Sequence, residues 1–148
     1  MTLDVIEKAT GDVREAPTRA GIERLEAAMR ASPDQIEIPT THTFGPGFYA
    51  RTIAIPAGAS LTGKVHATEH IFIISRGDIT LVTEDGRRRV QAPFQMVCRP
   101  GLKRAGYAHT EVVCTNVHIT DETDLAALER ELIEHDSLSM PEAFEVLP

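Results

Sequence analysis

The sequence predicts a mainly β protein, an antiparallel barrel or sandwich with a short helix on each side. Between Phe44 and Thr120 apolar residues alternate with a period of two, the runs are rich in β-branched residues, and Gly, Pro and Asp interrupt them at short intervals. The 148 residues suit one hydrophobic core. We expect an N-terminal extension with one short helix (1–43), the barrel (44–120), and an acidic helix with a C-terminal tail (121–148).

A change to helical spacing marks each flanking helix. Ile22, Leu25 and Met29 recur at that spacing within residues 20–30, and Ser32-Pro33 ends the pattern. After Asp121 another set of apolar residues falls on one helical face: Leu125, Leu128, Leu132 and Ile133. Beyond Asp136 the chain has scattered apolar residues and two prolines, which predicts a tail that docks in a groove of its own barrel or of a neighbour.

Strands are predicted in the barrel at 48–55, 61–65, 70–75, 78–83, 88–91, 94–98 and 112–120. Residues 84–87 have the composition of a tight hairpin turn in which Gly86 supplies a positive φ. Cys98 and Cys114 fall within two of the strands and have no metal-site or disulfide spacing. We expect both to be buried thiols.

Charge and hydropathy exclude several classes of protein. The net charge is −7, and the last 28 residues carry nine acidic side chains against one basic, so the barrel itself is close to neutral. Nucleic-acid binding needs a concentrated basic surface, which this balance does not provide. No run has the length of a membrane span, and the N-terminus lacks the features of a secretory signal. We expect a protein that is not secreted and has no membrane partner.

Two histidines give the most informative pattern. On a continuous strand, His66 and His70 share one face but lie about 13 Å apart along the chain, unless a barrel bend shortens the span. The pattern His-x-x-Glu-His also occurs on the helix of one class of zinc protease. The β-branched run that follows, ended by Gly77, favours a strand here.

From Phe44 to Thr120 the chain resembles the cupin superfamily, whose members are double-stranded β-helix barrels of jelly-roll type. Aligned on Gly77, His66 falls at the second His of the first cupin motif, while His70 falls at its Glu and Lys64 at its first His. In the second motif, which Pro100-Gly101 begins, Arg104 falls at the His position. The resemblance implies the cupin-type barrel, with cationic residues at two of the four metal-ligand positions.

These cationic residues count against a metal ion. At an effective dielectric constant of about 20, a Lys or Arg charge 4 Å from a divalent ion costs roughly 8 kcal/mol. We therefore expect no cofactor, unless Lys64 and Arg104 turn away from the site. In that case the alternative is a divalent transition metal, and the ligand candidates are His66, His70, His109 and His118. His118 shares strand parity with Cys114 and Asn116.

The same barrel positions also suit an anion or a small-molecule ligand. The candidate binding residues are Tyr49, Arg51, Lys64, His66, His70 and Arg104. Tyr49 and Arg51 share strand parity with Ile53, so they are expected to face inward. A structural interpretation stays open beside this one, with Lys64, Lys103 and Arg104 as solvated residues of the barrel rim. No nucleophile or catalytic pattern is present, so we predict no catalytic residues.

Within the superfamily, the segments at 45–70, 100–110 and 116–125 are similar to uncharacterised cupin-like proteins of tailed bacteriophages and prophages. This resemblance implies a virion or host-cytoplasm setting and a homo-oligomer, a dimer or larger. We predict a non-catalytic structural, decoration or assembly module, in which the helical stripe at Ile22 and the tail contact a second copy or another virion protein. Whether the protein is an enzyme stays open. The alternative function is a metal-dependent or anion-binding small-molecule cupin that uses His66 and His70.

Overall fold

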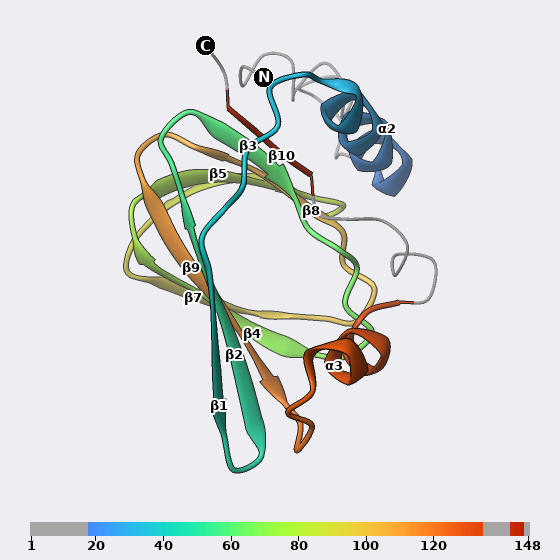
Figure 1. The fold of residues 1–148 in the computed structure, drawn as a ribbon. Helices are drawn as coiled ribbons and strands as arrows, with labels where there is room; N and C mark the ends of the chain where they lie inside the picture. Colours follow the sequence, from blue (N-terminus) through green and yellow to red (C-terminus); the bar gives the residue numbers. More distant parts are fainter. Residues whose placement is uncertain (1–17, 135–142, 147–148) are drawn as a thin grey trace.

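The computed structural model describes residues 18–134 and 143–146, and two five-stranded antiparallel sheets form a barrel (Figure 1). The first sheet has the order β1 (Thr40–Gly45), β2 (Phe48–Ile55), β9 (Val112–Ile119), β4 (His70–Arg76) and β7 (Phe94–Cys98). The second has the order β10 (Ala143–Val146), β3 (Ala59–Thr62), β8 (Arg104–Ala108), β5 (Asp78–Thr83) and β6 (Gly86–Gln91). The predicted mainly β, antiparallel fold is confirmed.

The core lies between the two sheets. Alternate residues of β2 and β4 point inward from the first sheet, and β5 contributes inward residues from the second. The buried apolar side chains from these three strands are Ile53, Ile55, Phe72, Ile74, Ile79 and Leu81. Cys98 and Cys114 are buried thiols in β7 and β9, as predicted. The 84–87 turn joins β5 to β6, and Gly86 has a φ of 128°.

The N-terminal helix α2 (Arg19–Ala31) covers the barrel beside β3 and β10 (Figure 1). Its cap is Thr18, whose side chain accepts a 3.0 Å hydrogen bond from the Gly21 amide. Ile22, Leu25 and Met29 are fully buried against Val82 and Ala105 of the same chain. The expectation that this stripe contacts a partner is therefore wrong, because the barrel of the same chain covers it.

The C-terminal helix α3 (Leu125–Leu132) lies at the other end of the barrel (Figure 1). Asp124 caps it by accepting a 2.9 Å hydrogen bond from the Ala127 amide. Leu128 and Leu132 are buried against Tyr49 of β2, which fixes the helix over the barrel opening. None of the described helices is long and apolar enough to cross a membrane.

The tail returns to the barrel that it follows. Strand β10 pairs antiparallel with β3, with Phe144 opposite Leu61. This is one of the two positions that we expected for the tail, a groove of its own barrel. The rest of the tail lies outside the described residues, and the predicted homo-oligomer and virion contacts stay predictions.

Candidate functional site

Three histidines meet at the end of the barrel that α3 covers. His70 is the first residue of β4, His118 lies in the neighbouring strand β9, and His66 lies in the loop between β3 and β4. The ring centroids are 4.3 Å apart for His66 and His70, 4.9 Å for His66 and His118, and 4.7 Å for His70 and His118. All three side chains are buried, so the barrel holds an imidazole cluster that water barely reaches.

A break in the chain brings His66 and His70 together. The predicted continuous strand through both residues is wrong, because β3 ends at Thr62 and β4 begins at His70. His66 forms an isolated bridge with Ile133, and its carbonyl accepts a 2.9 Å hydrogen bond from the Gly101 amide. The Ala67 amide donates to the Leu132 carbonyl at 2.7 Å. These bonds hold the loop against the end of α3, which turns an expected separation of about 13 Å into ring contact.

One nitrogen of each histidine in the cluster has no hydrogen-bond partner among the described residues. Within the part of the chain that the structure describes, His66 Nδ1, His118 Nδ1 and His70 Nε2 are buried and have no partner. The other nitrogen of His70, Nδ1, donates to the Thr68 carbonyl at 3.2 Å, so the lone pair of this ring is on Nε2. One nitrogen from each of the three histidines can be chosen so that all lie within 4.8 Å of one another.

The surroundings keep the three imidazoles neutral. Burial lowers the pKa of His70 and of His118 to about 4, and it lowers the pKa of His66 further still. The charge of nearby Arg104 lowers all three pKa values as well. At neutral pH each ring therefore keeps a lone pair that can bind a metal ion.

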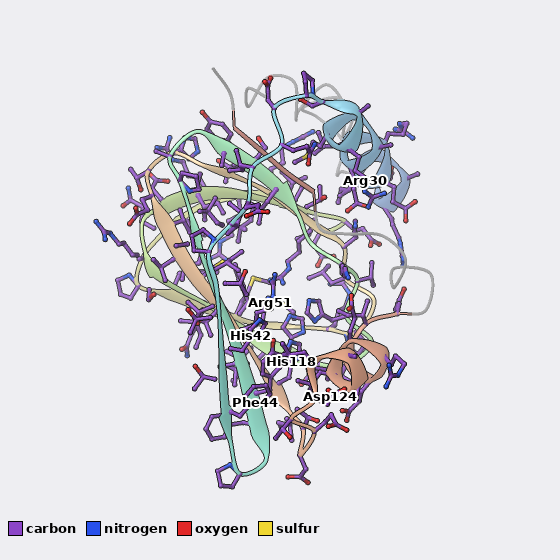
Figure 2. All side chains as sticks on the ribbon, in the orientation of Figure 1. Arg30, His42, Phe44, Arg51, His118 and Asp124 are labelled. Atoms are coloured by element: carbon purple, nitrogen blue, oxygen red, sulfur yellow. The ribbon has the colours of Figure 1, made fainter. Side chains whose placement is uncertain are left out.

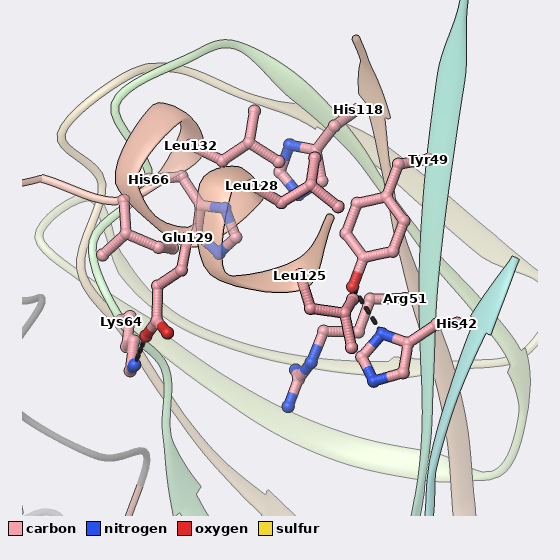
Figure 3. Close-up of a pocket in the computed structure, with 11 residues that line it drawn as sticks. His42, Tyr49, Arg51, Lys64, His66, His118, Leu125, Leu128, Glu129 and Leu132 are labelled. Carbon is pink, nitrogen blue, oxygen red and sulfur yellow. Dashed lines mark hydrogen bonds and ion pairs between the residues drawn. The ribbon is translucent and has the colours of Figure 1, made fainter. Parts of the chain in front are cut away.

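Lys64 and Arg104, the two cationic residues at predicted ligand positions, make different contacts. Lys64 forms an ion pair with Glu129 of α3, which cancels its charge locally (Figure 3). Arg104 remains inside the barrel, where it donates to Asn116 Oδ1 at 3.1 Å and to Cys98 Sγ at 3.4 Å. Its guanidinium carbon also lies 4.3 Å from the centre of the Phe72 ring. Arg104 is therefore held in position against the first sheet, by contacts with β9, β7 and β4.

Two residues lie where the sequence did not place them. Lys103, interpreted as a solvated rim residue, is 3% exposed and pairs with buried Glu26 of α2 at 2.5 Å. His109, a predicted metal-ligand candidate, follows β8 and hydrogen-bonds to Thr80 of the second sheet at 2.8 Å. His109 is not part of the imidazole cluster, and the structure groups His66 and His70 with His118 instead.

A pocket of about 370 Å³ opens beside the cluster, at the low end of volumes that hold small molecules. His66, His118 and Arg51 line one part, and Figure 2 shows Arg51 and His118 inside the barrel. Tyr49 lines it as well, with its hydroxyl hydrogen-bonded to His42 Nδ1 at 2.7 Å (Figure 3). Both inward-facing residues predicted on β2 thus belong to the pocket.

The α3 helix supplies the other wall of the pocket. Its lining side chains, which were not among the predicted site residues, are Leu125, Leu128, Glu129 and Leu132. The sequence signal that could have found three of them is the apolar face of this helix. The pocket therefore has a polar floor on the barrel and a mainly apolar wall on α3 (Figure 3).

Comparison with solved structures identifies the architecture. The chain is similar to a cupin 2 domain-containing protein from Halorhodospira halophila, with 16% identity and a TM-score of 0.51 over 64% of this chain and 75% of that chain. It is also similar to the Cnp3 cupin domain of Schizosaccharomyces pombe, with 19% identity and a TM-score of 0.49 over 68% of this chain and 70% of that one.

No family model and no curated protein matches the chain. The structural likeness therefore shows the cupin-type fold alone. The resemblance to phage proteins stays a prediction from the sequence.

Proposed function

We propose that this cupin-type barrel binds one divalent transition-metal ion through His66, His70 and His118, and presents the ion to a small molecule in the adjoining pocket. The observation that carries the proposal is the set of three buried ring nitrogens without hydrogen-bond partners in the described residues. Burying unpaired polar atoms costs free energy, and a metal ion bound by one nitrogen of each ring would offset part of that cost.

The chemistry of the ligand set fits such an ion. Neutral imidazoles suit Zn²⁺, Fe²⁺, Co²⁺ and Ni²⁺, and three protein ligands leave a coordination position for water or a substrate. The hydrogen bond from His70 Nδ1 to the Thr68 carbonyl is the kind of contact that orients a metal-binding histidine. A bound ion would act as a Lewis acid on an oxygen atom of the molecule in the pocket.

The ion pair of Lys64 removes one objection to a metal. A Lys charge beside the ion would repel it, but the carboxylate of Glu129 compensates that charge. The charge of Arg104 stays close enough to lower the pKa values of the histidines. The charge of Arg51 also lowers the pKa values of His66 and His118, so the metal site must work beside two cations.

Metal content measured by plasma mass spectrometry tests the proposal. The protein is purified without a His tag, and metal-free samples are reloaded with each of the four ions. We expect about one ion per chain, and less than a tenth of that in the His66→Ala, His70→Ala and His118→Ala variants.

The matched control is His109→Ala, which removes a histidine outside the cluster and should leave the metal content unchanged. Circular dichroism confirms that each variant is folded. A folded wild-type protein that takes up none of the four ions, or single variants that all keep full metal content, would overturn the proposal.

The alternative function is a non-catalytic structural role in a virion, which the sequence resemblance to phage proteins suggests. One feature that suggested it, the apolar stripe of α2, has another explanation because the stripe packs on its own barrel. The oligomeric state stays a prediction that light scattering can test.

A further inference from the structure

We propose that two copies of this chain dimerise face to face through the outer surface of the first sheet, the one formed by β1, β2, β9, β4 and β7. The inference goes beyond the proposed metal site, which uses histidines on the inner side of this sheet. It also names a different contact from the one expected from the sequence, because the barrel of the same chain covers the α2 stripe.

The outer surface of this sheet is apolar and exposed. The register of the strands places Ile71 of β4 between Val97 of β7 and Val117 of β9, and it pairs Phe48 of β2 with Ile119 of β9. Ile119 is 89% exposed, Val97 62% and Ile71 43%. Helix α2 packs on strands of the second sheet and α3 lies at the barrel opening, so neither covers this surface (Figure 1). A contiguous apolar patch of this kind marks an interaction surface.

Charged side chains are confined to the margin of this surface. The outward positions of the five described strands hold Thr, Ser, Gly, Ala, Val, Ile and Phe, apart from Gln95. Arg76 follows a bulge at the end of β4 and pairs with Glu111 at 3.1 Å. The second sheet differs, because its outer surface carries Asp78 and Arg89, which pair at 2.8 Å. Only the first sheet therefore presents an uncharged outer surface.

The hydroxyl groups of three residues on this surface already have partners within it. The hydroxyls of Thr52 and Thr115 share a 2.7 Å hydrogen bond across β2 and β9. The Ser75 hydroxyl donates to the Val113 carbonyl at 3.4 Å. Covering these groups leaves their hydrogen bonds in place, so removing water from the surface costs little free energy there.

A second copy is the partner that fits these properties. The chain has a net charge of −7, so two copies repel each other wherever their charged surfaces meet. In a twofold dimer the same patch faces itself, and an uncharged patch brings no like charges together. Two sheets with the same twist also pack well in the aligned arrangement of a β-sandwich.

The area of the surface is sufficient for a dimer. With strands about 4.8 Å apart and about 3.3 Å per residue, five strands over about six residues cover about 500 Å² in plan. Two copies would therefore bury about 1,000 Å², the area that a specific interface needs. Protruding side chains such as Ile119 add to this contact.

Light scattering and sedimentation equilibrium of the purified chain test the inference. We expect twice the 16.2 kDa mass of one chain at micromolar concentrations. Ile71→Lys and Val97→Lys each place a charge on the patch, where the twofold axis brings it near its own copy. Each variant should raise the dissociation constant of the dimer at least tenfold.

The matched control is Leu125→Lys. Leu125 is an apolar residue of α3 that is 48% exposed but lies outside the proposed interface, so the dimer should persist in this variant. Circular dichroism confirms that each variant is folded. Val97→Lys should keep the metal content of the wild type, because its side chain points away from the histidines.

Two results would overturn the inference. One is a wild-type chain that stays monomeric, including a monomer that binds lipid vesicles or another protein through this surface. The other is a dimer that both lysine variants leave intact, since it would use another surface. Neither result affects the metal proposal, and a dimer that takes up no metal ion leaves this inference standing.

Discussion

The buried ion pair between Glu26 and Lys103 gives a sharp test of how the barrel holds its N-terminal helix. Lys103 Nζ lies 2.5 Å from Glu26 Oε2 and 2.8 Å from the Gly63 carbonyl oxygen. Both charged side chains are about 5% exposed or less. Arg30 reaches the other oxygen of Glu26 at 2.7 Å from a more exposed position. The pair therefore ties α2 to the segments that carry Lys64 and Arg104.

Replacing Lys103 with Met leaves the Glu26 carboxylate buried with one partner fewer. Removing one member of a buried pair costs about 3–5 kcal/mol, and the contact with Arg30 puts the expected loss near the lower end, at about 3 kcal/mol. The double variant Glu26→Gln/Lys103→Met removes both charges, so it should be within about 1 kcal/mol of the wild type. The double variant should therefore be about 2 kcal/mol more stable than Lys103→Met, and measuring Glu26→Gln alone completes the cycle that gives the coupling energy.

Urea denaturation followed by circular dichroism at pH 7 measures these free energies of unfolding. The control is Arg76→Met, which removes an exposed partner of Glu111 and should cost less than about 1 kcal/mol. If Lys103→Met costs no more than this control, or if the double variant is as unstable as the single one, the burial and pairing seen here do not determine stability.

Two further predictions concern stability. The Arg89 guanidinium holds the pKa of Asp78 at about 2, below its ordinary value of 3.8, so the stabilisation by this pair is complete above about pH 4 and is lost as the pH falls through 2. Urea midpoints of Asp78→Asn should therefore fall below those of the wild type at pH 7 and meet them near pH 2; a gap that persists at pH 2 would contradict the assignment. Gly77 has a φ of 96°, and a Cβ there would lie 2.2 Å from the Glu111 carbonyl oxygen, so Gly77→Ala should cost roughly 2–5 kcal/mol. Gly58 has a similar φ but open space around it, so Gly58→Ala should cost only about 1–2 kcal/mol. Equal losses of thermal stability in the two variants would show that the backbone shifts to relieve the clash at residue 77.

Most of the strands that the sequence predicted have a buried face. Periodicity located β2, β4, β7 and β9 because core contacts impose alternation on them, whereas β5 is buried on both faces and was located by its β-branched run. The predicted ranges 61–65 and 88–91 overlap β3 and β6. Strand β1 was missed because most of its residues are exposed, which leaves no apolar pattern. Strand β8 was missed because three of its five residues are Ala or Gly. At Gly106 a Cβ would lie 3.1 Å from Ile79 and 3.2 Å from Leu61, so packing itself excludes the residues that would signal a strand.

The alternation of side chains along the strands also predicted part of the site. Parity along β9 placed His118 on the inward face with Cys114, and parity along β2 placed Tyr49 and Arg51. The approach of His66 to His70 could not be predicted, because it depends on a loop held by hydrogen bonds to α3. The ion pair of Lys64 joins residues 65 positions apart, and no local pattern reports such a contact.

The contacts of Lys64 and Arg104 change the conclusion about whether a metal ion can bind. From the sequence, two cations at ligand positions argued against a metal ion. In the structure one of them, Lys64, is neutralised by Glu129, while Arg104 stays charged beside the imidazoles. A fixed cation penalises a metal ion, so an ion at this site must gain more from the three imidazoles than it loses to the charge of Arg104.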